Sequence, residues 1–123
     1  MGAGDLEIAN QFLAALATAA ETGDREGVIP FLSAGIEWVT PKRTLRGVEE
    51  IRTDLTWLRP PDTLEVEFER GELTDLGEGR VALDVHEVYR VRGSGDFAYA
   101  RDRRLELTIR GDGIARYEMR VTG

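Results

Sequence analysis

Apolar residues recur at helical spacing through the first part of the chain, at positions 6, 9, 12, 13, 16 and 20. This pattern predicts an amphipathic helix that ends at Gly23. Asp24 then predicts the N-cap of a short second helix that ends near Leu32. The opening segment is therefore expected to be helical.

Alternating apolar and polar residues in Ile36-Glu37-Trp38-Val39-Thr40 predict a strand that stops at Pro41. A basic turn follows. A third helix is then predicted from Gly47 to the Pro60-Pro61 pair, which ends it. Its apolar positions are Val48, Ile51, Leu55 and Leu58.

Beyond Pro61 the pattern changes to a period of two, which is typical of strands. Four strands separated by loops at 75–79, 93–95 and 111–113 predict an antiparallel meander. Gly71 is expected to provide a bulge in the first of these strands. Helices followed by such a meander predict an α+β fold, with three N-terminal helices packed in a curved antiparallel sheet.

The segment 80–110 predicts its own register when it folds back at Gly93-Ser94-Gly95, because opposite charges then face each other across the hairpin. In this register Glu87 opposes Arg101 on the apolar phase. A carboxylate and a guanidinium are costly to bury unless they are paired, so these two are the candidate catalytic residues. The other opposed pairs are Leu83 with Leu105, Asp84 with Arg104, His86 with Asp102, Tyr89 with Tyr99 and Val91 with Phe97.

Two interpretations of Glu87 and Arg101 stay open. They form either an acid–base pair beside a bound molecule or a structural ion pair near the rim of the fold. Arg103 shares the phase of Arg101 and is expected to face Val85. An aromatic wall for a flat apolar ligand is the companion hypothesis, with plain core packing as its alternative. The predicted substrate-binding residues are Trp38, Thr40, Trp57, Tyr89, Tyr99, Arg103, Tyr117 and Met119.

Length, composition and net charge limit the classes of molecule that this chain is expected to bind. The chain has 123 residues, the length of a single domain, here predicted to span 1–123. Its net charge of −7 argues against nucleic acid or an anionic membrane as the main partner. The chain has no cysteine, which excludes disulfides and thiolate metal sites. The acidic strip 62–72 is interpreted as a solvated strand face, so no metal or cofactor is expected. With neither a secretory signal nor a long apolar span, the cytoplasm is the expected location.

The outer face of the hairpin combines Val88, Ala98 and Ala100 with the charges Asp84, Arg104, His86 and Asp102. Such a face suits a self-complementary contact, so a homodimer is expected. His86 is the single histidine and its phase is the outer one, so its pairing with Asp102 is interpreted as a surface contact. No nucleophile shares that phase.

The element order resembles the nuclear transport factor 2-like superfamily, and within it the SnoaL-like branch. Three signals carry the resemblance: Gly23-Asp24, the strand Ile36 to Pro41, and Leu-Arg-Gly-Val-Glu-Glu-Ile-Arg at 45–52. The resemblance implies a cone-shaped domain with a pocket at its open end. It also implies cofactor-free isomerases, cyclases or epoxide hydrolases among its relatives, beside non-catalytic binding and association modules.

The catalytic positions of these relatives fall on other residue types here. By resemblance, the three ketosteroid isomerase roles fall on Thr40, Leu16 and a position at or near Leu105, and the acid–base position of SnoaL-type cyclases falls on Met119. The paired Arg and Asp of epoxide hydrolases are replaced by Glu87 and Tyr89. Isomerisation of steroids by the known mechanism is thus not expected, because an enolate needs both a base and a donor. Glu87 with Arg101 is left as the candidate site.

Overall fold

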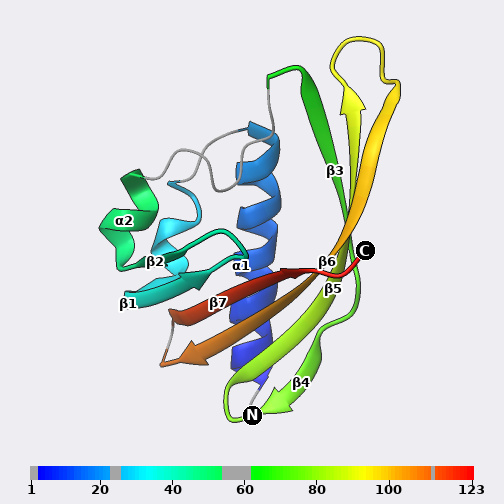
Figure 1. Cartoon of the computed structure of the whole chain (residues 1–123). Helices are drawn as coiled ribbons and strands as arrows, with labels where there is room; N and C mark the ends of the chain where they lie inside the picture. Colours follow the sequence, from blue (N-terminus) through cyan, green and yellow to red (C-terminus); the bar gives the residue numbers. More distant parts are fainter. Residues whose placement is uncertain (1–2, 23–25, 54–61, 112) are drawn as a thin grey trace.

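The computed structural model describes residues 3–22, 26–53, 62–111 and 113–123 (Figure 1). Their helical elements are α1 (Ala3–Thr22), the 3₁₀ turn η1 (Ile29–Phe31) and α2 (Val48–Thr53). The strands are β1 (Leu32–Val39), β2 (Thr44–Arg46), β3 (Leu64–Arg70), β4 (Thr74–Gly77), β5 (Arg80–Val91), β6 (Phe97–Arg110) and β7 (Gly113–Val121).

The prediction of three helices was wrong for the described residues, which form two α-helices, α1 and α2. The predicted N-cap of the second helix, Asp24, lies outside the described residues. In the described part of this segment only η1 is helical, and Leu32 already has an extended backbone and begins β1. Pro30 explains this, because proline lacks the amide hydrogen that an α-helix needs. The apolar positions Leu55 and Leu58 of the expected third helix lie outside the described residues.

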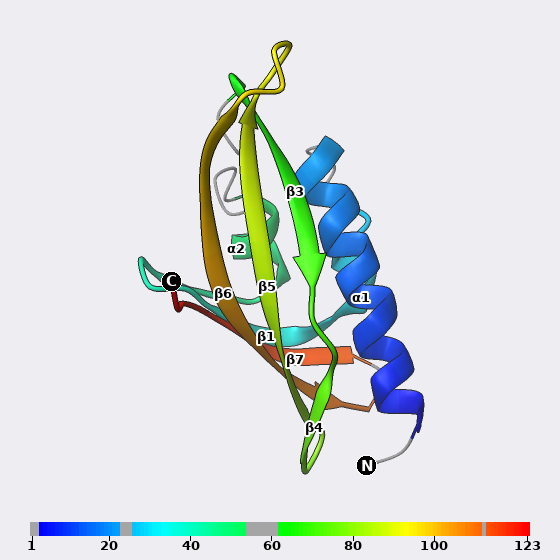
Figure 2. The ribbon, with the colours of Figure 1, turned by 90° about the vertical axis from the view of Figure 1, so that its right-hand side faces the viewer.

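One sheet contains every described strand, in the order β2-β1-β7-β6-β5-β3, with β4 paired to β5. The sheet curves around α1, and both α-helices lie on its concave side (Figures 1 and 2). The prediction of a purely antiparallel sheet needs correction, because β1 and β7 pair in parallel. Most of the chain lies between these two strands, so no turn sequence connects them and their pairing could not be predicted from a local pattern.

The main core fills the space between α1 and the concave face of the sheet. Phe12 and Leu16 of α1 are buried there against strand residues such as Ile36, Leu83 and Leu107. The helical spacing of the sequence therefore identified the buried face of α1 correctly.

The hairpin of β5 and β6 has the predicted register over most of its length. Leu83 opposes Leu105, Glu87 opposes Arg101, and Tyr89 opposes Tyr99. Toward the tip the register shifts, so that Phe97 faces Arg90 and not Val91 as predicted. A β-bulge explains the shift, since one extra residue in β6 moves Phe97 into the outward phase. Its side chain is 61% exposed.

Gly71 lies at the break between β3 and β4, both of which pair with β5. One extra residue is accommodated there, as expected of a bulge near Gly71. Its amide donates a 2.7 Å hydrogen bond to the carbonyl of Asp84. A Cβ at this position would lie 3.1 Å from the same carbonyl oxygen, which leaves almost no room for a side chain. Phe68 is thereby aligned with Glu87, and Val66 with Tyr89.

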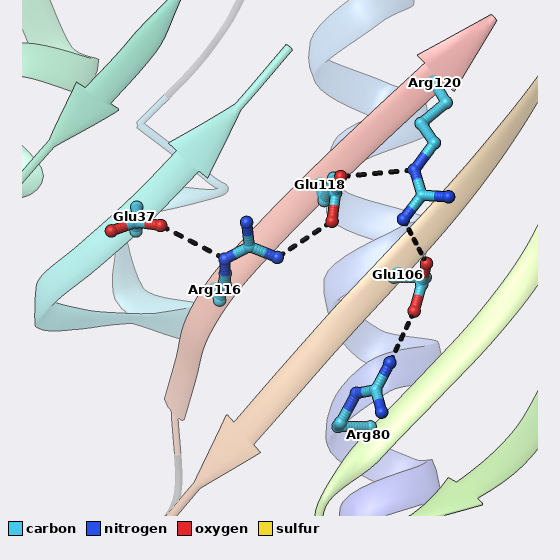
Figure 3. Close-up of polar contacts among 6 residues, drawn as sticks. All are labelled: Glu37, Arg80, Glu106, Arg116, Glu118 and Arg120. Carbon is cyan, nitrogen blue, oxygen red and sulfur yellow. Dashed lines mark hydrogen bonds and ion pairs between the residues drawn. The ribbon is translucent and has the colours of Figure 1, made fainter.

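Alternating charges connect four strands on the face of the sheet turned away from α1 (Figure 3). Arg116 donates to Glu37 at 3.1 Å and to Glu118 at 2.8 Å, which ties the parallel pair β1–β7 together at the surface. Hydrogen bonds from Arg120 and Arg116 lower the pKa of Glu118. The complete series is Glu37, Arg116, Glu118, Arg120, Glu106 and Arg80.

The same outer face carries the predicted pair of His86 and Asp102, whose Nδ1 and Oδ1 atoms lie 2.7 Å apart. This hydrogen bond raises the pKa of His86. The pair therefore contributes stability that is present below the ordinary histidine pKa and is lost as the pH rises through the raised value.

We predict that the NMR titration of the single histidine shows a pKa above its ordinary value, and that Asp102→Asn moves it back. Asp75→Asn, an exposed acid in β4, is the control and should leave the titration unchanged. A histidine that titrates identically in the parent and in Asp102→Asn would contradict the hairpin register in solution.

Candidate functional site

Glu87 is the one charged or polar residue that is buried in the described part of the chain, with 2% of its surface exposed. Its position follows from the alternation of β5, because Val85, Glu87 and Tyr89 all point to the concave side. A carboxylate in such a place needs charged partners. The strand β6 provides them.

Two arginines of β6 meet the same oxygen of Glu87. Nε of Arg101 donates a 2.9 Å hydrogen bond to Oε1, and Nε of Arg103 lies 2.6 Å from that atom. The second contact is an ion pair without hydrogen-bond geometry. Among the described residues this buried nitrogen of Arg103 therefore has no hydrogen-bond acceptor. The side chain of Arg101 is 34% exposed and that of Arg103 only 14%, so the pair extends from the interior toward the surface.

Tyr89 links the ion pair to an aromatic surface. Arg101 donates a 2.7 Å hydrogen bond from Nη2 to the Tyr89 hydroxyl, and its guanidinium lies 5.2 Å from the centre of that ring. The ring of Tyr89 stacks on Tyr99 with centroids 4.4 Å apart and an angle of 15°. Tyr89 is buried, whereas Tyr99 is 43% exposed.

Burial dominates the protonation equilibria of this cluster. It raises the pKa of Glu87, while the charge of Arg101 and hydrogen bonds from Arg101 and Tyr89 act in the opposite direction. Burial and the nearby charge of Glu87 also raise the pKa of Tyr89. The same two causes raise the pKa of Tyr117. Both tyrosines therefore remain neutral hydrogen-bonding groups near neutral pH.

The other predicted wall residues divide into two groups. Trp38 and Tyr117 stack with centroids 3.8 Å apart, and Phe12 meets both rings edge-on. All three are buried members of the main core. These three side chains fill the main core and do not form a wall for a ligand. Tyr99 is therefore the exposed aromatic residue beside Arg101.

Thr40 and Met119 lie elsewhere. The hydroxyl of Thr40 donates to the carbonyl of Arg43 at 3.1 Å and so serves the turn between β1 and β2. Met119 opposes Leu105 and is half-buried against the main core. Trp57 lies outside the described residues. Glu87, Tyr89, Tyr99, Arg101 and Arg103 are thus the predicted residues that the structure brings together.

A hollow of about 270 Å³ lies next to Tyr89 of this cluster, between the last turn of α1, the strand β3 and Arg92, which directly follows β5. Ala20 and Val66 line it and pack with Tyr89 in a second, smaller apolar cluster. The remaining lining residues are Glu21, Glu65 and Arg92. The sequence analysis did not predict this hollow. The expected bulge at Gly71 was a partial signal, since it sets the register in which Val66 faces Tyr89.

The role of Arg103 as a second partner of Glu87 was also missed. Its phase was recognised, and it does oppose Val85 as predicted. Strand alternation gives a side chain's direction but not its reach, so a diagonal contact from Arg103 to Glu87 could not be distinguished from an extension to the rim.

A carboxylate, two guanidiniums and two phenol rings can hold a proton and stabilise an oxyanion next to a flat ring. Within the described segments, no three His, Cys, Asp or Glu side chains are grouped in a way that could hold a metal ion. In those segments, too, no helix has the length and apolar character to cross a membrane.

The sequence matches no family model and no curated protein, but the architecture is similar to that of many solved structures. A nuclear transport factor 2-like protein from Anabaena variabilis superimposes with a TM-score of 0.79 at 15% identity, covering 100% of this chain and 93% of that one. This chain has the nuclear transport factor 2-like fold.

Two further solved structures have the same fold, and their names give a co-crystallized molecule or an activity. TerC, co-crystallized with polyporic acid, has a TM-score of 0.71 at 20% identity, with 98% of this chain and 92% of that chain covered. A candidate polyketide cyclase from Xanthomonas campestris has a TM-score of 0.68 at 17% identity, covering 94% and 90%. The predicted nuclear transport factor 2-like fold is therefore confirmed, while membership of the superfamily and of its SnoaL-like branch stays a prediction.

Proposed function

We propose that this cone domain binds a small apolar or aromatic molecule on the concave side of β5 and β6, and that Glu87 exchanges a proton with it. Arg101 orients the carboxylate and stabilises negative charge on an oxygen of the ligand. The reaction class is cofactor-free acid–base chemistry, namely isomerisation, cyclisation or epoxide hydrolysis. The polyketide cyclase name of a protein with the same fold supports this class.

One observation carries the proposal. Glu87 is buried to 2% exposure beside the partly exposed Arg101, and burial raises its pKa. A carboxyl group whose pKa moves toward neutrality is a better general base than an exposed one, because the ideal catalytic pKa lies near the working pH. Buried carboxylates also reduce stability, which proteins tolerate where function requires it.

The alternative function is a non-catalytic binding or association module. The contact of Arg103 with Glu87 favours it, since two guanidiniums around one carboxylate also make a structural ion cluster. In that case Glu87 would support the fold, and binding would need only the aromatic surface of Tyr99 and the hollow next to Tyr89.

Proton exchange with an aromatic ketone separates the two functions. We predict that the parent protein accelerates hydrogen–deuterium exchange at the α-carbon of 2-tetralone, followed by NMR, and that Glu87→Gln slows this exchange by about 10²–10⁴-fold. Glu72→Gln, which removes an exposed carboxylate outside the cluster, should exchange like the parent. Thermal melting checks that both variants fold.

Equal exchange rates in the parent and in a folded Glu87→Gln would remove Glu87 from the proposed chemistry. If 2-tetralone bound to the parent without any accelerated exchange, the non-catalytic module would be the better description.

We also propose that two copies of the chain pair through the outer face of β5 and β6. Val88 and Ala100 oppose each other there, and the exposed Phe97 lies near the tip of the same hairpin. The flanking pair of Arg104 with Asp84, at 3.6 Å, offers charges of both signs, which suits a two-fold contact.

For this pairing we predict a dimer mass by light scattering at micromolar concentration. Arg104→Glu should shift the mass toward the monomer because it places an acid opposite Asp84, whereas Arg110→Glu at the far end of β6 should not. A monomeric parent, or equal behaviour of the two variants, would count against this interface.

A further inference from the structure

The cluster around Glu87 carries more positive than negative charge. Arg101 and Arg103 both pair with the single carboxylate of Glu87. Within the described residues neither arginine forms an ion pair with a second acid. The neighbouring groups Tyr89 and Tyr117 have raised pKa values and stay neutral. Among the described residues, one guanidinium charge is therefore left without a counterion on the concave side of the sheet.

Hydrogen-bonding capacity is left over as well. The hydrogen bonds of Arg101 go from Nε to Glu87 and from Nη2 to Tyr89, so that Nη1 has no acceptor among the described residues. The buried Nε of Arg103 also has no acceptor there. An uncompensated buried charge is unfavourable, and a guanidinium binds planar oxyanions strongly and with defined geometry.

An aromatic surface lies directly beside these donors. Tyr99 and Arg101 are two residues apart on β6 and share its inward phase, roughly 7 Å from each other along the strand. The stack of Tyr99 on Tyr89 is exposed on the Tyr99 side. A flat ring placed against Tyr99 would therefore bring an attached acidic oxygen within reach of Arg101.

We infer that the ligand of this site is a flat aromatic anion, a carboxylate or an acidic phenol or enol, with its ring against Tyr99 and its oxygen on Arg101 and Arg103. This inference rests on the proposed binding site and specifies its ligand class. The adjoining hollow has the opposite preference, because Glu21 and Glu65 outnumber Arg92 around it. The acidic group of the ligand is therefore expected beside Arg101 and Arg103, and not in the hollow.

Matched probes test the inference. Binding of 1-naphthoate and of its neutral analogue 1-naphthamide is measured by NMR titration at low salt, where charge–charge attraction is least screened. We expect the parent to bind the carboxylate about tenfold more tightly than the amide, which corresponds to one added charge-assisted contact. Arg101→Gln should remove that preference, so that the two probes bind this variant with equal affinity.

Two further variants sharpen the test. Glu87→Gln should bind 1-naphthoate more tightly than the parent, because it removes the carboxylate that competes for both arginines, and the ligand should raise its melting temperature. Arg92→Gln is the matched control at the neighbouring hollow and should keep the preference of the parent. If Arg101→Gln does not fold, Arg101→Lys retains the charge but not the planar fork and should lose part of the preference.

Equal affinities of the two probes for the parent, absence of 1-naphthoate binding, or an equal effect of Arg92→Gln and Arg101→Gln would each overturn the inference. These outcomes differ from a failure of the proposed chemistry. A protein that prefers 1-naphthoate but exchanges 2-tetralone independently of Glu87 retains the anion site and loses the proton-transfer role.

Discussion

The buried carboxylate of Glu87 and its two arginines are the interaction on which the site depends. Strand alternation forces Glu87 inward, and the register of β5 and β6 brings Arg101 and Arg103 to the same oxygen. A buried carboxylate without these partners would be strongly destabilising. The hairpin register therefore determines which residues form the cluster. A shift of the register by a single residue would expose Glu87 and separate it from Arg101.

The aromatic residues divide according to how α1 and the sheet enclose them. Trp38, Tyr117 and Phe12 lie where the helix covers the sheet, and their rings complete the core. Tyr89 and Tyr99 lie farther toward the tip of the hairpin, where the cover ends and one ring is exposed. The proposed binding surface thus begins where the packing of the core stops, and the charged cluster lies at that boundary.

Local patterns predicted the local parts of this structure well. The face of α1, the charge-matched register of β5 with β6, the bulge at Gly71 and the inward Glu87 all follow from periodicity and pairing along neighbouring segments. The parallel pairing of β1 with β7 and the hollow beside Val66 depend on contacts between distant segments. The second guanidinium at Glu87 depends on the reach of the Arg103 side chain, which strand alternation does not give. The failure of the second helix could have been predicted, because Pro30 lies within the expected helix, beyond its first turn.

A double-mutant cycle between Glu87 and Arg103 tests the central claim most directly. Free energies of unfolding are measured for the parent, Glu87→Gln, Arg103→Met and the double variant. Each single change leaves an unpaired buried charge or donor, so we expect the double variant to lose at least about 1 kcal/mol less than the sum of the single losses. Additive losses, within about 0.5 kcal/mol, would mean that the two side chains do not interact, and would contradict the account.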